Sequence, residues 1–104
     1  MANATVTIID DIVSVDPDRL SAGLGENVNL HWKISTPGWT FPSNGIVIAN
    51  SGTEFSEPEV KNNGKQFKWK DKNTPGLSFK YTITVTNGTT TKSLDPTIIN
   101  RASR

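Results

Sequence analysis

The chain has 104 residues and carries 11 lysine or arginine against 10 aspartate or glutamate side chains, for a formal net charge of +1. This nearly balanced charge excludes the uniformly basic surface of a dedicated nucleic-acid binder, and the absence of cysteine excludes disulfides, thiolate catalysis and thiolate metal sites. Only 34% of the residues are hydrophobic, so we expect a thin two-layer core in one domain that spans residues 1–104.

The charges are unevenly distributed along the chain. Residues 1–26 hold five carboxylates and one arginine, whereas residues 61–72 hold five lysines and one aspartate. Such a dipolar distribution can steer an acidic partner or a head-to-tail contact between two copies of the chain. Solvated strand faces explain it more simply.

The first expected strands lie near the N-terminus. Residues 5–9 and 12–15 predict one strand or a broken pair, interrupted by two aspartates and closed before Pro17. Residues 28–34 alternate apolar and polar side chains, which predicts a half-buried strand. A bent or split strand is expected over residues 39–48, where Pro42 and a turn divide two extended pieces.

The middle of the chain predicts an edge strand and a mixed strand. Residues 53–60 are polar, and Pro58 marks this segment as an edge because proline lacks a backbone donor. In the strand expected over residues 65–70, Phe67 and Trp69 share one face, and Lys68 and Lys70 take the other.

The clearest strand covers residues 77–86, where apolar and polar side chains alternate without interruption. Asn87-Gly88 follows it and predicts a tight hairpin turn. The last strand is expected over residues 94–99 with a kink at Pro96, and residues 101–104 form a frayed tail.

About seven short strands with turn signals between them predict an antiparallel β-sandwich with Greek-key connections. A small closed barrel is the main competing architecture. No segment has the period of a helix, and no internal repeat appears.

Two segments carry a resemblance to immunoglobulin-like domains. Residues 25–34, Gly-Glu-Asn-Val-Asn-Leu-His-Trp-Lys-Ile, resemble their second strand, and residues 73–76 with 81–88 are similar to the late strands of PKD-type and fibronectin type III-like modules. The resemblance implies an immunoglobulin-like superfold in which Tyr81 occupies the place of the corner tyrosine, whose hydroxyl bonds to the backbone upstream. The cysteine pair and the Gly-Asp-Gly turn of these families are missing, and a superfold carries no function by itself.

The closing segment is similar to another sandwich family. Residues 94–100, Leu-Asp-Pro-Thr-Ile-Ile-Asn, together with the strand pattern before them, resemble cupredoxin-like sandwiches. A blue-copper site needs two histidines and a cysteine, and this chain has His31 alone. A cupredoxin-like version of this chain would therefore lack copper.

No catalytic group stands out. His31 alternates with core residues and is expected on a solvent face, and no second histidine or cysteine accompanies it as a base or a ligand. Asp10, Asp11, Asp16 and Asp18 could gather in loops around Ca²⁺, but a solvated turn explains them better. We expect no enzymatic activity, no metal and no cofactor.

Three aromatic residues are the candidate binding residues. Trp39 and Phe41 lie between prolines in a loop-like context, where regular alternation does not account for them, and Trp69 joins them as a third ring. Exposed, they would form a contact platform for a protein or a sugar ring. The alternative is that Trp39 fills the core, as the tryptophan of an immunoglobulin domain does. The lysines around Phe67 and Trp69 suggest single-stranded nucleic acid, but their opposite faces argue against that ligand.

We therefore expect a non-catalytic interaction module that binds a protein partner, or a second copy of itself, through the edge strand over residues 53–60 and the Trp39/Phe41 surface. The alternative is a carbohydrate-binding module that uses Trp39 and Phe41. No apolar run of 18 residues occurs, which speaks against a membrane span. A cytoplasmic location is expected, unless a signal peptide preceded Met1 and was removed.

Overall fold

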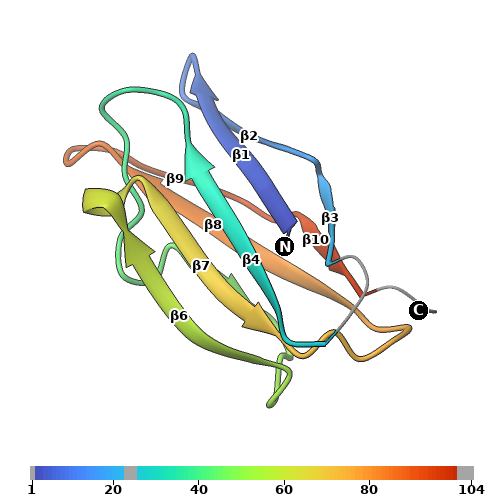
Figure 1. Ribbon diagram of the computed structural model, residues 1–104. Coiled ribbons are helices and arrows are strands. Elements are labelled where there is room, and N and C mark those ends of the chain that lie inside the picture. Colours follow the sequence, from blue (N-terminus) through green and yellow to red (C-terminus); the bar gives the residue numbers. More distant parts are fainter. Residues whose placement is uncertain (1, 23–25, 101–104) are drawn as a thin grey trace.

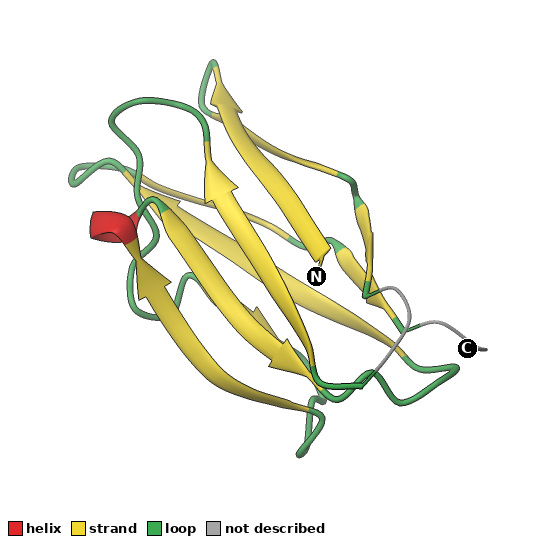
Figure 2. Ribbon diagram, in the orientation of Figure 1, coloured by secondary structure: helices red, strands yellow, loops and turns green. Residues whose placement is uncertain are grey.

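Two β-sheets make up the fold, as the computed structural model of residues 2–22 and 26–100 shows (Figures 1 and 2). No α-helix occurs among these residues. The strands are β1 (Ala2–Ile9), β2 (Ile12–Asp16), β3 (Arg19–Ser21), β4 (Val28–Ile34), β5 (Ile46–Ile48), β6 (Phe55–Lys61), β7 (Gln66–Asp71), β8 (Ser78–Thr86), β9 (Thr91–Leu94) and β10 (Thr97–Ile99), with one 3-10 turn, η1 (Asn62–Gly64). The tail expected at residues 101–104 lies outside the described residues.

The sheets are mixed. The first sheet has the strand order β2-β1-β4-β7-β6, and the second has the order β3-β10-β8-β5, with β9 also paired to β8. Neighbouring strands are antiparallel except for two pairs, β1 with β4 and β3 with β10, which are parallel. The expectation of a purely antiparallel sandwich is therefore wrong at these two pairs, whereas the all-β architecture is confirmed.

The described residues contain ten strands instead of about seven, largely because prolines divide longer segments. Pro17 separates β2 from β3, and the chain leaves the first sheet there to join the second. Pro96 separates β9 from β10 at the expected kink. Proline cannot donate a ladder hydrogen bond, which favours the end of β2 at Asp16 and of β9 at Leu94, shortly before these two residues.

The core lies between the sheets and consists of the inward-facing side chains of the alternating strands. Trp32 on β4 and Tyr81 on β8 are among its largest fully buried residues. Trp32 Nε1 donates to the Tyr81 hydroxyl at 2.9 Å, a bond that joins the two sheets. The tyrosine-corner resemblance implied a backbone partner for Tyr81; the structure gives its hydroxyl this indole donor.

Two further features of the fold bear on function. β6 forms one edge of the first sheet, as the sequence predicted for residues 53–60. None of the described residues belongs to a helix that is long and apolar enough to cross a membrane.

Candidate functional site

The aromatic residues that the sequence singled out do not form an exposed platform. Trp39 is 8% exposed and Phe41 is 3% exposed, and both belong to the core. Of the two arrangements that the sequence left open, the burial agrees with the one in which Trp39 fills the core. Neither ring presents a face to a sugar in this conformation.

Hydrogen bonds hold these two rings inside. The backbone of Thr40 pairs with Thr86 at the end of β8, and the Phe41 amide donates to the Gly64 carbonyl at 2.7 Å. The Lys65 ammonium group donates to the Trp39 carbonyl at 2.8 Å and to the Thr36 carbonyl at 3.1 Å. The segment that looked like an exposed loop is thus tied to η1, to Lys65 and to the end of β8, and its aromatic side chains fill the space between the sheets.

Trp69 lies apart from this segment. It is partly buried against the core on β7, its Nε1 donates to the Ile46 carbonyl at 2.9 Å, and its ring meets Phe55 edge to face at 6.5 Å. The Phe41 ring instead contacts Phe67 at 5.8 Å. The structure therefore does not bring the three candidate residues together as one surface.

The edge strand β6 is interrupted in its middle. The pairing with β7 shifts register between Ser56 and Glu59, and Glu57 has a positive φ of 57°. Pro58 removes a backbone donor at the same place. A bulge and a proline are both devices that hinder the addition of another strand, so β6 is a poor template for edge pairing.

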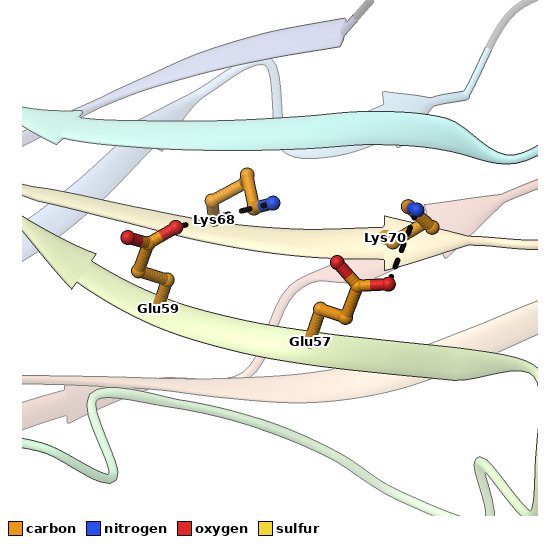
Figure 3. A network of polar contacts seen from close by, with 4 residues as sticks. All are labelled: Glu57, Glu59, Lys68 and Lys70. Atoms are coloured by element: carbon orange, nitrogen blue, oxygen red, sulfur yellow. Dashed lines mark ion pairs between the residues drawn. The ribbon is translucent and has the colours of Figure 1, made fainter.

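Ion pairs cross from β6 to β7 on the outer face of the first sheet (Figure 3). Lys70 lies 3.1 Å from Glu57, and Lys68 lies 3.9 Å from Glu59. The predicted division of faces on β7 is confirmed: Phe67 is buried, and Lys68 and Lys70 point outward.

A shallow groove of about 350 Å³ opens on the same outer face, between β1, β4 and β7. We call it the first-sheet groove; its polar lining consists of Asn3, Thr5, His31, Lys33 and Gln66. The strand register brings these residues together, because Asn3 pairs with His31, Thr5 with Lys33, and Lys33 with Gln66. Short side chains from β1 thus lie beside longer ones from β4 and β7, which hollows the face.

Positive charge surrounds the histidine of this groove. Burial, followed by the charges of Lys61 and Lys68, lowers the pKa of His31 below its usual value. The imidazole is therefore neutral near pH 7, while the lysines around it are charged. His31 is half-buried instead of fully solvent-exposed, and it offers a neutral donor or acceptor beside lysines, of which Lys68 also pairs with Glu59.

The groove does not contain a recognisable catalytic or metal-binding set. No group of three histidine, cysteine, aspartate or glutamate side chains placed to hold a metal occurs among residues 2–22 and 26–100. The four N-terminal aspartates considered for Ca²⁺ are exposed and are not gathered into one site. What the groove offers is hydrogen-bond donors and positive charge, which suits binding to anionic groups.

A second polar cluster lies where the β5–β6 turn, the β7–β8 loop and the end of β10 meet. Glu54 accepts hydrogen bonds at 2.8 Å from both the amide and the hydroxyl of Thr74, and at 3.0 Å from the Asn100 carboxamide. Burial acts to raise the pKa of Glu54, but these hydrogen bonds outweigh it and hold the pKa below its usual value.

Asp71 adjoins this cluster and is fully buried. Its Oδ1 accepts from the Asn73 amide at 2.8 Å, and its Oδ2 has no hydrogen-bond donor. Burial, with the neighbouring Glu54 carboxylate adding to it, raises the pKa of Asp71 to about 6. A proton on Asp71 relieves the repulsion between the two carboxyl groups. The hydrogen bonds of Glu54 connect the β5–β6 turn to the β7–β8 loop and to the end of β10.

Comparison with known proteins adds no family assignment. The chain matches no model of a known protein family, and its sequence matches no curated protein.

Sequence reasoning placed His31 and the lysines of β7 on outer faces but missed the groove. The alternation in residues 28–34 and 65–70 was sufficient to assign those faces. A strand was predicted over residues 5–9, but no local pattern predicts that β1, which contributes Asn3 and Thr5, pairs with β4, because the choice of partner strand is a long-range property.

Proposed function

We propose that the protein is a non-catalytic interaction module that binds an acidic partner on the outer face of its first sheet. The observation that carries this proposal is the half-buried His31 in the first-sheet groove, with Lys33 beside it and Lys61 and Lys68 near enough to lower its pKa. A carboxylate-bearing partner would neutralise this charge and accept hydrogen bonds from the groove.

The position of the groove on three paired strands supports a role in recognition. Its polar side chains project from β1, β4 and β7, so their spacing is set by the sheet. The groove is partly open to solvent, so a protruding segment of a protein can reach its lining.

The other modes of binding have less support. A carbohydrate platform needs exposed rings, and Trp39 and Phe41 are buried. Strand addition at residues 53–60 needs a regular edge, and β6 is bulged there.

We also propose that the topology is the cupredoxin-like alternative, without copper. The parallel pairs β1/β4 and β3/β10 support this choice, because immunoglobulin domains are built from antiparallel sheets. The lone His31 cannot supply the ligands of a blue-copper site.

The binding proposal is tested by titrating the protein with a ten-residue polyglutamate peptide and following the His31 ring by NMR. We expect saturable shifts, a rise in the pKa of His31 on binding, and affinity that falls as salt is added. The double variant Lys33→Gln/Lys68→Gln should weaken binding at least tenfold.

The matched control is Arg19→Gln/Lys80→Gln, which removes the same charge from the second sheet, where both residues flank Thr97. Equal weakening by both variants would mean that net charge alone attracts the peptide, and the proposal would fail. It would also fail if His31 did not respond to the peptide.

A further inference from the structure

The turn between β1 and β2 combines two exposed apolar side chains with two carboxylates. Ile9 and Ile12 are 65% and 68% exposed and face each other across the hairpin as a register pair. Asp10 and Asp11 form the turn with φ values of 51° and 63°, which is the backbone of a type I′ hairpin. We call these four residues the hairpin tip; in Figure 1 it projects beyond the neighbouring end of β4.

The hairpin geometry does not require this composition. A type I′ turn is best satisfied by Asn-Gly, and exposed strand positions elsewhere in the chain carry hydroxyl side chains, as Ser14 and Thr91 do. Ile9 and Ile12 are the most exposed of the large hydrophobic residues among those described, which include Val47 at 51%. An exposed apolar pair beside two charges has the composition of a small protein–protein interface, in which a polar rim surrounds an apolar centre.

β1 contributes residues to both the hairpin tip and the first-sheet groove, but these two surfaces cannot meet within one molecule. The groove contains Asn3 and Thr5 near the start of β1, and the tip follows its end. Six residues of extended chain separate residues 4 and 10, which is about 20 Å along a rigid strand. The charges of the two surfaces are nevertheless complementary. The tip has two carboxylates and Lys33 lines the groove, while Lys61 and Lys68 lie outside its lining but close enough to act on His31, and Lys68 also faces Glu59 at 3.9 Å.

We infer that the acidic partner of the first-sheet groove is a second copy of this chain, which docks its hairpin tip there. This inference rests on the function proposed above and names its ligand. The carboxylates of Asp10 and Asp11 lie against the lysines, and the isoleucine side chains cover the stems of the groove residues. Because tip and groove are different surfaces, the contact is head-to-tail and leaves one free tip and one free groove at the ends of every assembly.

The contact is expected to be weak and reversible. A four-residue tip buries far less than the roughly 1,200 Å² of a stable interface, and its ion pairs are screened by salt. Association should therefore appear only at high protein concentration and weaken at least tenfold between about 0.05 and 0.5 M salt.

The test uses sedimentation velocity on two variants of the full chain. The tip variant, Ile9→Thr/Asp10→Asn/Asp11→Gly/Ile12→Thr, retains a favourable hairpin turn and removes the charges and the apolar pair. The groove variant, Lys33→Glu/Lys68→Glu, changes two outward-facing side chains and removes the Lys68–Glu59 ion pair. We expect the wild-type chain to form a concentration-dependent series of oligomers and each variant alone to stay monomeric.

Mixing the two variants gives the decisive result. The tip variant retains its groove and the groove variant retains its tip, so an equimolar mixture should form 1:1 dimers and nothing larger. A mixture that stays monomeric, or a wild-type chain that stays monomeric at millimolar concentration, would overturn the inference. Polyglutamate binding separates the two proposals: if the tip variant binds the peptide as tightly as the wild-type chain while self-association is absent, the groove function stands and the second copy is not its partner.

Discussion

Trp32 and Tyr81 form the one side-chain hydrogen bond between fully buried aromatic residues that joins the two sheets in the described part of the chain. The indole donates to the phenolic oxygen at 2.9 Å, and the rings meet at a centroid distance of 5.3 Å with a tilt of 58°. Burial raises the pKa of Tyr81 to about 12, so the phenol stays protonated at any physiological pH. The pair links β4 of the first sheet to β8 of the second across the core.

Removing the phenolic oxygen should be costly. Tyr81→Phe leaves the buried Trp32 Nε1 without an acceptor, and we expect the free energy of unfolding to fall by about 1–3 kcal/mol. Urea denaturation followed by tryptophan fluorescence measures the change. Trp32→Phe and the double variant complete a double-mutant cycle; a coupling energy near zero would show that the bond contributes nothing.

The stability of the protein should fall as pH rises through 6, because Asp71 binds its proton more tightly in the folded chain. Its pKa rises from 3.8 to about 6, so the stabilisation is fully present below pH 3.8 and is lost as the pH passes through 6. A shift of this size corresponds to at most about 3 kcal/mol. The depressed pKa of Glu54 acts in the opposite sense, but only below its usual value of 4.5.

Asp71→Asn imitates the protonated carboxyl group and should remove this dependence. We expect the variant to be more stable than the wild-type chain at pH 8 and to show a flatter profile between pH 5 and 7. Urea unfolding at a series of pH values measures both, and an NMR titration of the Asp71 carboxyl carbon locates its pKa directly. A wild-type profile that is flat over this window would contradict the assignment.

Gly64 and Gly38 have nearly equal φ angles but differ in the atoms around them. Gly64 has φ +88°, and a Cβ there would lie 2.9 Å from Thr40 Cβ; Gly38 has φ +86°, and a Cβ there would meet no atom within 4 Å. Gly38→Ala should therefore cost about 1 kcal/mol for the left-handed conformation alone. Gly64→Ala should cost about 1–3 kcal/mol more because it overpacks the contact with Thr40. Thermal unfolding compares the two, and equal losses would refute the close approach.

The Lys65 ammonium group should control the exposure of Trp39. Lys65→Met keeps the aliphatic stem but removes the bonds to Thr36 and Trp39, and we expect a loss of about 1–3 kcal/mol. Loosening this segment should also raise acrylamide quenching of tryptophan fluorescence in the folded chain. Lys72→Met, at an exposed position, is the control and should leave quenching unchanged. Unchanged quenching in Lys65→Met would mean that packing alone holds Trp39 inside.

Single residues show which structural features the local sequence predicts and which depend on residues far away in the chain. Pro58 identified an edge strand from its chemistry alone, since a residue without a backbone donor cannot lie between two ladders. Trp39 could not be placed in the same way. Its burial depends on the bonds that Lys65 and the β8 end make to its segment, and these partners lie 26 and more residues away in the chain.

The sequence by itself determined the all-β class, the strand faces of β4, β7 and β8, and the kinks at prolines, because a period of two and the geometry of proline act within a few residues. Only the tertiary structure decided that β1 lies parallel to β4, that Trp39 and Phe41 fill the core, and that His31 shares a groove with Lys33 and Gln66. Which strands pair depends on how the apolar faces of all strands are buried together in the folded chain. A local sequence pattern does not contain this information.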